Sequence, residues 1–73
     1  MNVGQAATVA RQHLAALIPK TSAADFRLEE FLWDDHLGFW TLTLGYTPQE
    51  GARAYKIVRV SEADKAVLSV KDR

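Results

Sequence analysis

The stretch LGFWTLTLGY, residues 37–46, gives the clearest indication of the fold, because its side chains alternate between two sets. Successive side chains of a β-strand point to opposite faces of the sheet, so this period of two predicts a strand. One face carries Trp40, Leu42, Leu44 and Tyr46, and the other carries Phe39, Thr41 and Thr43. The first set is large enough to form the centre of a hydrophobic core.

Turn signals on both sides of this stretch predict neighbouring strands. The polar residues 34–36 and the segment 47–51, which contains proline and glycine, interrupt the apolar pattern as turns do. Strands are therefore expected over about residues 26–33 and 53–60, and a third turn over 61–65 leads to a last short strand over 66–71. Strands joined by such short turns predict an antiparallel meander.

The first part of the chain shows helical spacing instead. Apolar residues recur every three to four positions, which predicts a helix over about residues 3–18. Asn2 and Gln5 have the spacing of a capping box, and Pro19 lacks the amide proton that a longer helix needs. The expected fold is a single α+β domain over residues 1–73, with one N-terminal helix packed on a sheet of three or four antiparallel strands.

Both patterns together predict which side chains form the core. A single helix covers one face of a sheet, so the core combines the helix stripe with one set of alternating strand residues. The predicted core is Ala7, Ala10, Leu14, Leu17, Phe26, Leu28, Leu32, Trp40, Leu42, Leu44, Val58 and Leu68.

The strands hold more large apolar residues than this one face requires. An apolar set on the opposite face of the sheet is typical of a partner-binding surface. The alternative interpretation is that these side chains cover the sheet edge, or that the true register differs by one residue. The predicted contact residues are Phe31, Trp33, Phe39, Tyr55 and Ile57, with a homodimer as the simplest way to cover them.

Charge and composition argue against several classes of protein. The 9 basic and 9 acidic residues balance, whereas nucleic-acid binders carry a basic excess, so no nucleic-acid partner is expected. The chain has no cysteine and therefore no disulfide or thiolate metal site, and no cofactor is expected. No apolar run approaches the ~20 residues of a membrane span. Residues 1–11 do not resemble a secretory signal, so we expect a cytoplasmic protein without membrane attachment.

Two alternative hypotheses follow from clusters of charged residues. Asp34, Asp35 and His36 could bind a divalent metal or supply a general base, although three consecutive residues at a turn point in different directions. Arg53, Lys56 and Arg59 give the last third of the chain a basic character that would suit RNA, although pairing with acidic neighbours in the sheet explains it as well.

The segment RAYKIVRVSEADKAVLSV, residues 53–70, resembles the end of a PepSY-type domain. In that pattern a strand runs into a hairpin of the form V-D-A-x-T-G-x-V-L-S. The matching residues are Val60, Ala63, Val67, Leu68 and Ser69, while Asp64 and Lys65 stand where the pattern has Thr and Gly. PepSY domains are non-catalytic modules, and some lie in protease propeptides. The resemblance implies a non-catalytic protein–protein interaction module, an inhibitor or adaptor rather than an enzyme.

Overall fold

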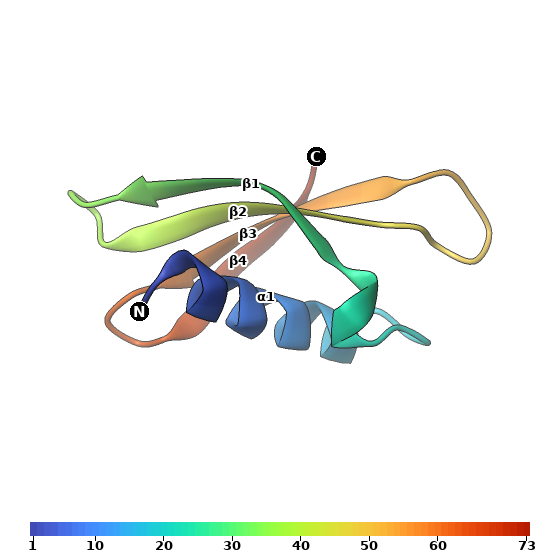
Figure 1. Ribbon diagram of the computed structural model, residues 1–73, viewed down its shortest axis with the longest axis horizontal. Helices are drawn as coiled ribbons and strands as arrows, with labels where there is room; N and C mark the ends of the chain where they lie inside the picture. Colours follow the sequence, from blue (N-terminus) through green and yellow to red (C-terminus); the bar gives the residue numbers. More distant parts are fainter.

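A computed structural model describes residues 1–73 as one helix beneath a four-stranded sheet (Figure 1). This arrangement confirms the predicted α+β fold. The elements in chain order are α1 (Val3–Leu17), the short 3₁₀ helix η1 (Ala23–Asp25), β1 (Arg27–Asp34), β2 (Phe39–Tyr46), β3 (Ala54–Ser61) and β4 (Ala66–Asp72).

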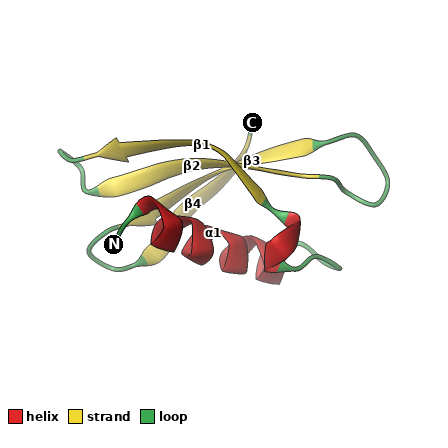
Figure 2. Ribbon diagram, viewed as in Figure 1, coloured by secondary structure: helices red, strands yellow, loops and turns green.

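The sheet is an antiparallel meander with the strand order β1-β2-β3-β4, so β1 and β4 are its two edges (Figure 2). Leu42 pairs with Phe31 of β1 on one side and with Val58 of β3 on the other. Residues directly opposite each other in antiparallel strands point to the same face. We call the face against which α1 packs the helix side, and the opposite face the outer side.

The ends of α1 follow from the residues that flank it. The Asn2 side chain accepts a hydrogen bond from the Gln5 amide, and the Gln5 side chain accepts one from the Asn2 amide, each 2.8 Å long. This capping box satisfies amide donors that have no partner inside the first turn. At the other end Ile18 has an extended backbone directly before Pro19, and the helix stops there.

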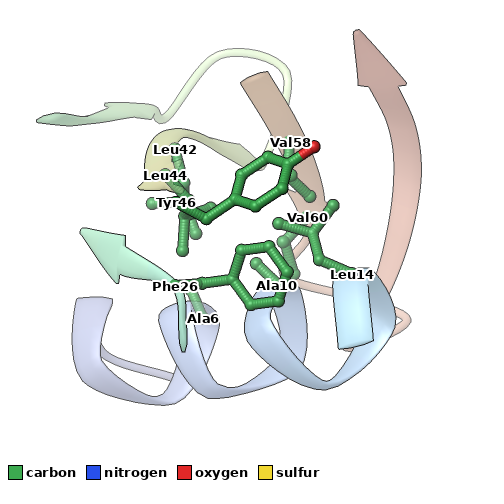
Figure 3. Packing of buried hydrophobic residues seen from close by; sticks show 9 residues of the cluster. All are labelled: Ala6, Ala10, Leu14, Phe26, Leu42, Leu44, Tyr46, Val58 and Val60. Carbon is green, nitrogen blue, oxygen red and sulfur yellow. The ribbon is translucent and has the colours of Figure 1, made fainter. Parts of the chain in front are cut away.

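The core lies between α1 and the central strands (Figure 3). Within it, the rings of Phe26 and Tyr46 pack with their centroids 5.1 Å apart. Nine buried residues form this cluster: Ala6, Ala10, Leu14, Phe26, Leu42, Leu44, Tyr46, Val58 and Val60. The small alanines on α1 let the helix approach the sheet closely. The larger side chains of the strands fill the space between the helix and the sheet.

The core prediction is confirmed for most residues and wrong for three leucines. Leu17, Leu32 and Leu68 are 56%, 67% and 55% exposed, respectively. Leu17 is the last residue of α1. Leu32 follows the extra residue Glu29 in β1, which reverses the side chains that point inward, and Leu68 is itself the extra, unpaired residue of β4.

Candidate interaction surface

The edge strand β1 exposes three large apolar residues in succession. Phe31, Leu32 and Trp33 are 58%, 67% and 38% exposed, and Leu37 in the following turn is 63% exposed. We call Phe31, Leu32 and Trp33 the β1 apolar run. Because no strand lies beyond β1, the outward-facing amides and carbonyls of its backbone also lack sheet partners.

The β1 apolar run presents side chains on both faces of the sheet. Phe31 pairs with Leu42, and Trp33 pairs with Trp40, so these two aromatic residues point to the helix side. The indole rings of Trp33 and Trp40 lie with their centroids 5.0 Å apart. Leu32 lies opposite Thr41 and points to the outer side.

Phe31 and Trp33 remain exposed on the helix side because one helix is too narrow for four strands. α1 packs mainly against β2, β3 and β4, so the far part of β1 extends beyond it (Figure 1). The helix does not cover the apolar side chains that project there. The result is an apolar surface beside the helix, at the free edge of the sheet.

The five predicted contact residues do not share one face, which corrects the sequence-based interpretation. Phe39, Tyr55 and Ile57 point to the outer side, as predicted. Phe31 and Trp33 point to the helix side, because a bulge at Glu29 shifts the register between Leu28 and Glu30. A strict period of two cannot reveal such an extra residue. The signal that was available is the run of three apolar residues, which one face alone cannot accommodate.

The outer side is covered in part by charged side chains of the same chain. The Arg59 guanidinium lies 5.4 Å from the centre of the Phe39 ring, and that of Arg73 lies 5.5 Å from the centre of the Tyr55 ring. Arg73 also forms an ion pair of 3.5 Å with Glu30 across the sheet. Phe39 and Tyr55 are consequently half-buried, and Ile57 is half-buried as well. The outer side is therefore a mixed polar surface rather than an open apolar one.

The Asp34-Asp35-His36 turn uses its first carboxylate to hold its own backbone. Asp34 Oδ1 accepts hydrogen bonds from the amides of His36 and Leu37, at 3.0 and 2.8 Å. No group of three or more His, Cys, Asp or Glu side chains in the chain is placed to hold a metal ion. The metal-site hypothesis thus lacks a set of ligands.

The three basic residues of the RNA hypothesis are separated by the fold. Lys56 lies opposite Leu44 on the helix side and pairs with Asp72, whereas Arg59 points to the outer side over Phe39. Arg53 precedes β3. These residues form no continuous basic face.

One ion pair lies beside the Trp33–Trp40 pair. The ammonium group of Met1 donates a hydrogen bond of 2.5 Å to the Glu62 carboxylate and lowers the pKa of that carboxyl below its ordinary value. Partial desolvation opposes this effect. The positive charge of Lys65 lowers the pKa further, while the buried Trp40 indole N–H has no hydrogen-bond partner.

A comparison of the chain with known protein families, characterised proteins and solved structures finds no match. The resemblance to PepSY-type domains therefore stays a prediction. None of the helices has the length and apolar character that crossing a membrane requires.

Proposed function

We propose that this chain is a non-catalytic protein–protein interaction module that binds another polypeptide through β1. The observation that carries the proposal is the exposure of Phe31, Leu32 and Trp33 in succession on a strand with a free edge. Sheet edges of this kind bind extended segments, because the backbone supplies hydrogen bonds and the alternate side chains supply contacts on both faces. The proposed location is the cytoplasm, as the sequence analysis expects.

A second copy of the chain is the simplest partner. Two β1 strands that meet antiparallel would join two sheets into one and bury both apolar runs about a two-fold axis. The net charge of zero supports this form of the proposal, because it leaves little long-range repulsion between copies. Phe39, Tyr55 and Ile57 are not part of this contact set, since Arg59 and Arg73 already cover the first two in part and Ile57 is half-buried on the inner strand β3.

Sedimentation equilibrium over a wide range of protein concentration tests the proposal. We expect the unaltered chain to associate reversibly and the double variant Phe31→Ser, Trp33→Ser to stay monomeric at every concentration. Leu68→Ser is the matched control, because Leu68 is as exposed as Phe31 but lies on the opposite edge, and we expect it to associate normally.

Two outcomes would contradict the proposal. Equal association of the double variant and the unaltered chain would place any interface elsewhere. A strictly monomeric chain would remove the homodimer and leave only a different polypeptide as partner. In that case the same variants are compared in pull-downs. If the double variant retains a partner protein as well as the Leu68→Ser variant does, β1 is rejected as the binding site of that partner.

A further inference from the structure

The largest depression of the molecule lies between α1 and the start of β1. Its volume is about 550 Å³, within the range of small-molecule sites, and it is open to solvent on one side. We call it the Arg11 pocket. Its lining includes Thr8 and Arg11 from α1, Ala23 and Ala24 from η1, and Phe26 and Leu28 at the start of β1.

Arg11 is the charged group of this pocket, and the fold holds it in place. Its Nε donates a hydrogen bond of 2.9 Å to the backbone carbonyl of Phe26. Arg11 takes part in none of the four ion pairs of the chain, and its two Nη atoms donate no hydrogen bond within it. The planar end of the guanidinium is thus oriented by the backbone while its terminal N–H groups remain free.

Arg27 also contributes to the rim of the pocket, but its charge lies elsewhere. Arg27 pairs with Gly45 in the sheet, and its Nη2 lies 3.4 Å from the point where a Cβ of Gly45 would stand, on the outer side. Its Nε is 3.4 Å from Glu29 Oε1. The Arg11 pocket therefore offers one positive charge and not two.

Apart from Thr8, the uncharged residues of the lining are apolar. The methyl groups of Ala23 and Ala24 and the Leu28 side chain supply the apolar surface, while Phe26, only 2% exposed, contributes little of it. A guanidinium with two free N–H groups at its end matches the two oxygens of a carboxylate. A phosphate, with more charge and stronger hydration, fits an apolar lining with a single cation less well.

We propose that the Arg11 pocket binds a carboxylate that carries a short apolar group. The carboxylate would accept hydrogen bonds from the Nη atoms of Arg11, and the apolar group would lie on the two alanines and Leu28. Such a group occurs in small organic acids and at the end of a peptide whose last residue is apolar. This proposal stands independently of the function proposed for β1.

Proton–nitrogen NMR titration, with the arginine Nε resonances included, tests the proposal. The probes are hexanoate, hexanol as the uncharged analogue, and acetate as the analogue without an apolar chain, all at one ionic strength. We expect saturable shifts at Arg11 Nε and at the Ala23 and Ala24 amides, with hexanoate bound ~10-fold more tightly than either analogue. Hexanoate shifts no larger than those from sodium chloride would overturn the proposal.

Two further probes distinguish the sources of the carboxylate. N-acetyl-leucine presents a peptide-like carboxyl end, and N-acetyl-leucinamide is its neutral control. Tighter binding of N-acetyl-leucine than of hexanoate would identify a peptide terminus as the ligand, and the reverse order would identify a free organic acid. Equal binding of N-acetyl-leucine and its amide, together with equal binding of hexanoate and hexanol, would show that the carboxylate is not recognised and would reject the proposal.

Variants locate the site. Arg11→Gln removes the charge and Thr8→Phe fills the pocket from an exposed helix position, and we expect each to weaken hexanoate binding ~10-fold. Arg53→Gln is the matched control, because Arg53 is exposed and outside the pocket, and it should bind normally. Urea unfolding checks that each variant is folded. If Arg11→Gln is unfolded, the hexanoate affinity of Thr8→Phe alone tests the assignment. Unchanged affinity in a folded Arg11→Gln or in Thr8→Phe would overturn the assignment.

Discussion

Leu42 and Leu32 lie on neighbouring strands but differ in burial. Leu42 is fully buried, whereas Leu32 is 67% exposed on the outer side. We expect Leu42→Ala to lower the free energy of unfolding by about 2–5 kcal/mol, because it removes buried methyl groups and leaves a cavity. Leu32→Ala should change it by less than about 0.5 kcal/mol.

Urea unfolding followed by tryptophan fluorescence measures both values. Since domains of this size have little stability to lose, Leu42→Ala should be partly unfolded without urea. An equal loss in the two variants would mean that Leu32 is a core residue and that the bulge at Glu29 is absent.

Glu62 predicts how stability depends on pH. The hydrogen bond and charge of the Met1 ammonium lower the pKa of Glu62 in the folded chain below its ordinary value of 4.5. A carboxyl group with a lowered pKa stabilises the fold above its ordinary pKa, and this contribution is lost as the pH falls through the lowered value. Glu62→Gln should therefore be less stable than the unaltered chain near neutral pH, and the difference should shrink toward acid pH.

Thermal unfolding of the two proteins at a series of pH values checks this behaviour. Asp35→Asn is the control, because Asp35 is exposed and takes part in no ion pair. A Glu62→Gln difference that does not change with pH would contradict the role of the ionised carboxylate.

At the scale of elements, the β1–β2 hairpin depends on Gly38. This residue has a φ of 74°, in the left-handed region that side chains with a Cβ rarely adopt. Its amide donates to the Asp34 carbonyl at 2.8 Å, and its carbonyl accepts from the Glu62 amide at 3.0 Å. Gly38 therefore connects the turn of the β1–β2 hairpin to the turn of the β3–β4 hairpin.

We expect Gly38→Ala to destabilise the chain by about 1–2 kcal/mol, because alanine is strained in the left-handed region. Gly51→Ala is the matched control, since Gly51 has no positive φ and open space around its Cβ position. It should be neutral or slightly stabilising, because alanine restricts the unfolded chain. Chemical unfolding of both variants provides the comparison, and equal effects would show that the turn imposes no conformational requirement.

At the scale of the whole molecule, the two edges of the sheet carry net charges of opposite sign. β1 carries the acidic residues Glu29, Glu30 and Asp34 against one basic residue, Arg27, while β4 and the residue after it carry Lys71 and Arg73 against one acidic residue, Asp72. An interface between two β1 strands brings like charges together. An interface between β1 of one copy and β4 of another brings opposite charges together and would continue from copy to copy.

Salt therefore distinguishes the two forms of self-association. Added sodium chloride screens charges, so it should strengthen a β1–β1 dimer and weaken a β1–β4 assembly. We expect strengthening, because the β1 apolar run is longer than the apolar surface of β4. Sedimentation velocity at low and high salt measures the change, and weakening on added salt, with species larger than a dimer, would favour the β1–β4 assembly instead.

Local sequence patterns predict α1, the strands and their order along the chain, but not the short helix η1. The capping residues Asn2 and Gln5, the stop at Pro19 and the alternation of residues 37–46 act over a few neighbouring residues, so they can be recognised without the fold. The class of the fold followed from the same local signals. The five contact residues were only partly predictable, because their assignment required the register of β1.

Which apolar residues remain exposed depends on the packing of the whole chain. The bulge at Glu29 turns Phe31 and Trp33 to the helix side, and the width of one helix leaves them uncovered. Arg73 reaches Tyr55 and Glu30 across the outer side, which no local pattern indicates. Burial depends on contacts between segments that are distant in the chain, and the position of an extra residue in an edge strand is determined only when its neighbour pairs with it.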